Sequence, residues 1–84
     1  MIEDKIRKLV EDEITKAGYI LDEVTYGKDE NNINTLTLVI DKQGYISIND
    51  CVAVNDIVNP ILDASDPIEE SYVLDICSKE KGSE

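Results

Sequence analysis

The sequence predicts a small α/β (α+β) domain of two layers, with element order α-β-β-α-β and two helices on one face of a three-stranded mixed sheet. Its 84 residues, 42% of them hydrophobic, are enough for one core and too few for two. Two segments repeat apolar residues at three- and four-residue steps, and three shorter segments alternate apolar and polar residues. We expect residues 1–78 to form the domain and residues 79–84 to be a disordered polar tail.

The first element is predicted to be an amphipathic helix that ends before Gly18, a residue type favoured just past a helix C-terminus. Acidic residues in its first turn and Lys16 in its last suit the helix dipole. The expected inward stripe, flanked by Ile14, consists of Ile2, Ile6, Leu9, Val10 and Ala17.

Two strands are expected next, at about residues 20–27 and at Thr35–Ile40, because both segments are rich in β-branched or aromatic residues. The polar residues 28–32 between them suit a hairpin loop. The strands should therefore pair antiparallel and bury one face, to which the second contributes Leu36, Leu38 and Ile40.

A second helix is predicted to begin at Ser47, where Asp50 three residues later can complete a capping box. We expect this helix to end near Asp63, and Pro60 weakens its last turn because an interior proline forfeits a backbone hydrogen bond. Its expected inward stripe is Cys51, Val54, Val58, Ile61 and Leu62.

The last element is predicted to be a strand over residues 71–77, with Tyr72, Leu74 and Ile76 on one face. A right-handed crossover through the second helix makes this strand parallel to the second strand. Both helices then cover the same face of the sheet, so the opposite face is left exposed, and Asp75 should point towards it.

Composition disfavours several classes of function. A formal charge of −11 repels phosphate backbones and anionic membranes, and no GxxG loop of the kind used by KH domains is present, so we expect no direct nucleic-acid or membrane binding. There is no histidine, the two cysteines lack CxxC spacing, and Asp63 and Asp66 are the best carboxylate pair available for catalysis. The acidic residues 63–70 lack EF-hand spacing. We therefore expect neither an enzyme nor a metal or other cofactor.

Five short segments, in order and spacing, resemble the N-terminal domain of the bacterial ribosome maturation factor RimP, and the likeness covers about residues 1–78. These segments are Leu38–Asp41, Gly44, Ile48–Cys51, Leu62–Asp63 and Tyr72–Ile76. After Ser78, Lys79 and Glu80 stand where the family has Pro and Gly, so we expect a fragment of a two-domain protein, with a single-domain relative as the alternative.

The resemblance implies a non-enzymatic, cytoplasmic factor that assists maturation of the small ribosomal subunit by binding the immature subunit or a basic small-subunit ribosomal protein. The acidic charge suits such a partner, since residues 41–77 hold eight acidic residues and one lysine. We expect a monomer. The alternative is a structural or dimerisation module that uses the exposed sheet face or a strand edge.

Three aspartates are the candidate partner-binding residues: Asp41, Asp50 and Asp75. Asp41 and Asp50 match motif positions of the family, but a turn role for the first and a helix cap for the second explain them locally. Asp75 has no such local role and is the better candidate for contact.

Overall fold

The computed structural model describes residues 2–79 and contains the five predicted elements in the predicted order. Of the predicted polar tail, only Lys79 falls among the described residues. The elements are α1 (Ile2–Lys16), β1 (Ile20–Lys28), β2 (Asn34–Asp41), α2 (Ile48–Ser65) and β3 (Val73–Ser78).

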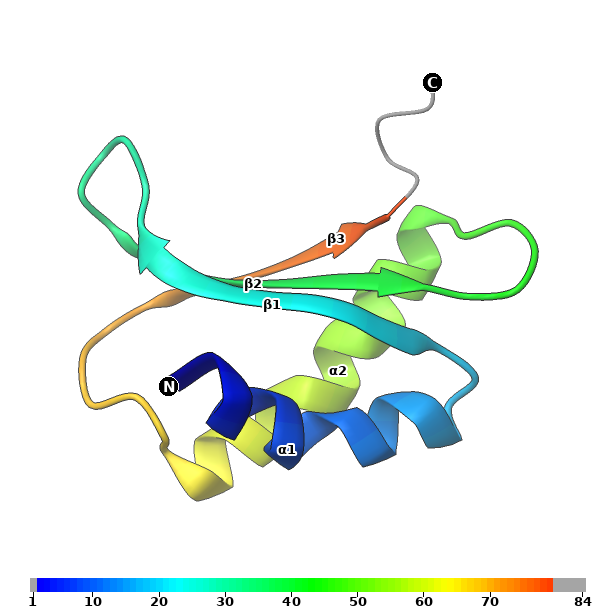
Figure 1. Cartoon of the computed structure of the whole chain (residues 1–84), viewed down its shortest axis with the longest axis horizontal. Helices are drawn as coiled ribbons and strands as arrows, with labels where there is room; N and C mark the ends of the chain where they lie inside the picture. Colours follow the sequence, from blue (N-terminus) through cyan, green and yellow to red (C-terminus); the bar gives the residue numbers. More distant parts are fainter. Residues whose placement is uncertain (1, 80–84) are drawn as a thin grey trace.

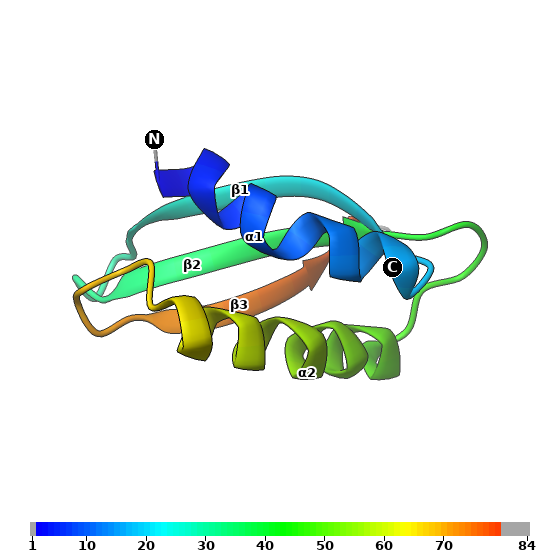
Figure 2. The same ribbon diagram turned by 90° about the horizontal axis from the view of Figure 1, so that it is seen from below.

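The three strands form the predicted mixed sheet, in which they lie in the order β1-β2-β3. β1 pairs antiparallel with β2, and β2 pairs parallel with β3. Both helices lie on the same side of the sheet, with α1 beneath β1 and α2 running along β3 (Figures 1 and 2). Among residues 2–79, no helix lies on the other side of the sheet, which confirms the predicted two-layer architecture.

The inward stripe of α1 is centred differently from the prediction. Ile6, Val10 and Ile14 are fully buried, whereas Ala17 is exposed. Ile14 therefore belongs to the centre of the core and not to its flank. The reason is that steps of four along the helix align these three residues with the sheet, while Ala17 lies beyond the last residue of the helix.

The end of α1 follows the predicted glycine stop. Gly18 has a left-handed backbone with φ of 95°, and its N–H donates to the carbonyl of Thr15. The N–H of Tyr19 donates to the carbonyl of Ile14 at 3.1 Å. This pair of bonds is a Schellman motif, and it turns the chain directly from α1 into β1.

A β-bulge in β1 was not predicted. Leu21 pairs with Ile40 and Glu23 pairs with Val39, which leaves Asp22 as the extra residue. In a regular strand Leu21 and Val24 would face opposite sides, because they are an odd number of residues apart. The bulge resets this alternation, so both side chains reach the core.

α2 is longer than predicted, since it passes Asp63 and ends at Ser65. Pro60 lies inside the helix on its exposed side, while Val58 and Leu62 on either side are buried in the core. Packing of these two side chains keeps the helix continuous across the proline. The helix stops at Asp66, whose φ of 47° is left-handed.

β3 begins two residues later than predicted, at Val73, where its pairing with Thr35 of β2 starts. Leu74 and Ile76 are half-buried against the core, and Asp75 between them is exposed, as the predicted alternation requires.

Candidate functional site

The side of the sheet opposite α1 and α2 is the candidate functional site, and we call it the uncovered face. Strand register places its residues in three rows that each cross all three strands. The rows are Glu23, Val39 and Cys77; Thr25, Thr37 and Asp75; and Gly27, Thr35 and Val73.

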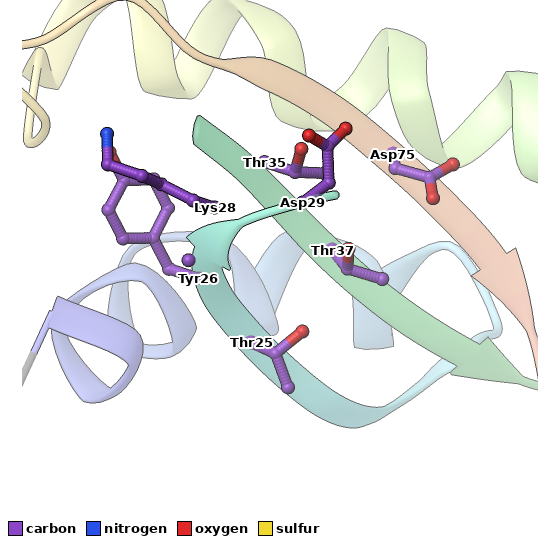
Figure 3. Close-up of a pocket in the computed structure, with 8 residues that line it drawn as sticks. Thr25, Tyr26, Lys28, Asp29, Thr35, Thr37 and Asp75 are labelled. Atoms are coloured by element: carbon purple, nitrogen blue, oxygen red, sulfur yellow. The ribbon is translucent and has the colours of Figure 1, made fainter. Parts of the chain in front are cut away.

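The middle row lines an open hollow of about 490 Å³ near the β1–β2 hairpin. The side chains of Thr25, Thr37 and Asp75 come from three neighbouring strands and project from the same face of the sheet (Figure 3). The remaining lining residues are Tyr26, Gly27, Lys28, Asp29 and Thr35. Threonine hydroxyls both donate and accept hydrogen bonds and a carboxylate accepts them, so this row can receive the ammonium or guanidinium group of a basic side chain.

Asp75 is exposed at the edge of this hollow. Its Oδ2 accepts a hydrogen bond of 3.4 Å from the Cys77 thiol, two residues along the same strand. Because a thiol is a weak donor, this bond leaves the carboxylate able to accept stronger ones.

Asp50 sits in a different environment, at the first turn of α2, where it ties three elements together. Its Oδ2 accepts hydrogen bonds from the backbone N–H of Ser47 at 2.8 Å and from the Ser47 hydroxyl at 3.2 Å. Its Oδ1 accepts from the Tyr19 hydroxyl at 2.7 Å and from Lys42 Nζ at 3.1 Å. The predicted capping role of Asp50 is therefore present, together with two tertiary contacts that the sequence did not reveal.

These contacts hold the pKa of Asp50 well below its usual value. The backbone N–H of Ser47 is the main cause, followed by the hydroxyl of Tyr19, and Lys42 adds to both. The same Tyr19–Asp50 bond raises the pKa of the tyrosine, because the hydroxyl proton is held by a carboxylate. Asp50 is thus charged and fully engaged within the domain.

Asp41 lies half-buried at the end of β2, where its Oδ1 accepts a 2.8 Å hydrogen bond from the N–H of Lys42. This bond matches the turn role considered from the sequence. Asp75 pairs with Thr37, which stands four residues before Asp41 in β2. Roughly 13 Å along the strand direction therefore separates Asp75 from Asp41. The three candidate aspartates therefore do not form one cluster, and Asp75 alone lies in the middle of the uncovered face.

The threonines beside Asp75 were not singled out from the sequence. Thr25 reaches this face because the bulge at Asp22 resets the alternation of β1, and a bulge has no clear sequence signal here. Thr37 could have been found from the alternation of β2, since it stands between Leu36 and Leu38.

The two cysteines and the acidic loop can also be placed. Cys51 is half-buried against the core, which suits the role of a small apolar residue, and burial raises the pKa of its thiol. Within residues 2–79, no three side chains of the His, Cys, Asp or Glu type are grouped so as to hold a metal ion. No helix in this part of the chain is long and apolar enough to cross a membrane.

A comparison with protein families agrees with the resemblance seen in the motifs. A family model for the RimP N-terminal domain matches residues 9–79, which is most of the chain. Members of this family are non-enzymatic ribosome maturation factors. The match spans β1, β2, α2 and β3 and the second half of α1, so it includes every strand of the uncovered face. The chain therefore belongs to the RimP N-terminal domain family.

Proposed function

We propose that this domain assists maturation of the small ribosomal subunit in the cytoplasm by binding a basic small-subunit ribosomal protein through its uncovered face. Family membership supports the role in ribosome maturation. The choice of surface depends on one observation: the exposed carboxylate of Asp75 lies beside two threonines on the uncovered face.

Charge supports a basic protein as the partner. The whole chain has a formal charge of −11, and residues 41–77 contribute eight acidic residues against one lysine. Such a field accelerates encounter with a cationic surface and disfavours approach to RNA phosphates. An acidic domain can thus hold a basic protein that would otherwise bind RNA nonspecifically.

Titration of the ¹⁵N-labelled chain with purified basic small-subunit proteins, followed by NMR, tests this proposal. We expect the largest shifts at Thr25, Thr37 and Asp75, and an affinity that falls as ionic strength rises. Asp75→Asn should weaken binding, whereas Asp12→Asn, which neutralises an exposed carboxylate on α1, should have little effect.

Three results would contradict the proposal. They are no binding to any basic small-subunit protein, an affinity independent of ionic strength, and an equal loss in the Asp75 and Asp12 variants.

Sedimentation at two concentrations tests the dimerisation alternative. We expect a monomer at both, because two copies that each carry −11 repel one another. A concentration-dependent dimer that Asp75→Asn disrupts would assign the uncovered face to self-association instead.

A further inference from the structure

A second surface of the domain exposes apolar side chains at the start of α2. Tyr45 is 80% exposed, Ile48 79% and Val52 54%, and we call these three residues the apolar corner. Ile48 and Val52 are four residues apart and so share one face of the helix, while Tyr45 comes two residues before the N-cap residue Ser47. The core stripe of α2, with Val54, lies on another face.

This clustering is unusual for the chain. Six large hydrophobic residues are exposed in the part that the structure describes, and three of them fall within the eight residues 45–52. Single exposed apolar residues are common on soluble proteins, but neighbouring ones mark contact surfaces. Folding does not require these three side chains, since none belongs to the core.

The surrounding structure holds the apolar corner in place. Asp50, within the same turn of α2, binds Ser47 of the loop, Lys42 beyond the end of β2 and Tyr19 before β1. Ile46, between Tyr45 and Ser47, is only 6% exposed and anchors the loop in the core. Apolar side chains on a fixed backbone lose little conformational entropy on binding, which favours their use as anchors.

We propose that the apolar corner is a second contact surface for the basic ribosomal protein, and that it receives apolar side chains from a segment rich in Lys or Arg. This inference rests on the proposed function. The charge of α2 supports it, because the 18 residues of the helix include three acidic and no basic ones. Asp56 is exposed one turn beyond Val52, where it can pair with a cation that flanks the inserted side chain.

Area and charge argue against a second copy of the chain as the occupant. A stable interface buries roughly 800 Å² on each partner. The apolar corner has three side chains, and even an aromatic one contributes only about 150–250 Å². Pairing two corners would also bring together two helices without a basic residue.

The position of the corner suits a partner that also contacts the uncovered face. The N-terminal end of α2 lies at the same end of the molecule as the C-terminal end of β3 (Figures 1 and 2). A single extended segment can therefore pass from the uncovered face round the end of the sheet to the corner.

The test compares the wild-type 84-residue chain with the double variant Tyr45→Ser/Ile48→Ser in titrations against purified basic small-subunit proteins. Ile33→Ser is the matched control, because it removes an exposed apolar side chain of the β1–β2 hairpin. We expect the double variant to lose affinity at least about fivefold, which corresponds to about 1 kcal/mol, and Ile33→Ser to bind like wild type. The salt dependence of the double variant should match wild type, since it removes no charge, whereas Asp75→Asn should reduce that dependence.

The outcomes separate the two proposals. If Asp75→Asn weakens binding and the double variant binds like wild type, the proposed contact at the apolar corner is refuted and the proposed function stands. Absence of any binding by wild type overturns both. An equal loss with Ile33→Ser, or wild-type self-association that the double variant abolishes, also overturns the corner as the partner's contact surface. Thermal melting monitored by circular dichroism should show that the double variant is as stable as wild type, because both replaced side chains are exposed.

Discussion

Replacing Asp75 by threonine should stabilise the domain while weakening its binding to a basic partner. Aspartate is among the residues least suited to a strand, and Asp75 lies in the middle of β3 with Thr37 beside it on β2. The full range of strand preferences is about 1 kcal/mol, and the substitution moves from the low end of that range to the high end. It loses a hydrogen bond from the Cys77 thiol, which is a weak donor.

The expected gain for Asp75→Thr is therefore about 0.5 kcal/mol in the free energy of unfolding. In a domain of this size such a gain raises the melting temperature by roughly 2–4 °C. Urea denaturation and thermal melting both measure it. Alanine lacks the high strand preference of threonine, so Asp75→Ala should change the free energy of unfolding by less than about 0.5 kcal/mol.

Binding should change in the opposite direction. An exposed ion pair contributes about 0.2–1 kcal/mol, so Asp75→Thr should reduce affinity for the basic protein by up to roughly fivefold at low ionic strength. A stability loss above about 0.5 kcal/mol would show that Asp75 has a structural role. A variant that is more stable and binds as tightly as wild type would refute its role in contact.

Three further substitutions test the account of the fold. Pro60→Ala should raise the free energy of unfolding by about 2 kcal/mol, because proline lacks the backbone N–H that an alanine at this exposed position of α2 can donate within the helix; an unchanged urea midpoint would contradict this. Leu38→Ala should lower it by about 2–5 kcal/mol, since Leu38 is fully buried on the central strand between Val24 and Ile76. A loss under about 1 kcal/mol would mean that the core closes around the cavity. Asp50→Asn should make the free energy of unfolding less dependent on pH. The carboxylate of Asp50 has a lower pKa in the folded than in the unfolded chain, so it stabilises the wild type above pH 3.8, its usual pKa. This stabilisation is lost as the pH falls from there through the pKa of the folded state. Urea midpoints between about pH 7 and pH 2 should therefore fall less in the variant, with the difference appearing below pH 3.8, and parallel curves would contradict the assignment.

The helix and strand order was predictable because each segment carries its own hydrophobic period and its own stop signal. Gly18 ends α1, and Ser47 with Asp50 begins α2, as their residue types predict. α2 was predicted to end near Asp63 and ends two residues later, at Ser65. The weakness expected of its last turn from Pro60 took no account of the core packing of the residues on either side, which keeps the helix continuous.

The candidate site was predictable only in part. The exposure of Asp75 follows from strand alternation and from a topology that places both helices on one face. The contacts of Asp50 with Tyr19 and Lys42 were not predictable, because they join residues brought together only by the fold. The exposure of Ile48 and Val52 could have been inferred from their position off the core stripe of α2.

By itself, the sequence determined the five elements, their order, the family and the acidic field, because periodicity, capping residues, motif spacing and charge are all local or additive properties of the chain. Only the tertiary structure decided how those elements present a surface. The bulge at Asp22 turned Thr25 towards Asp75, and the network around Asp50 fixed the loop that carries Tyr45. Both depend on contacts between residues far apart in the sequence, and such contacts form only when the sheet and helices have packed.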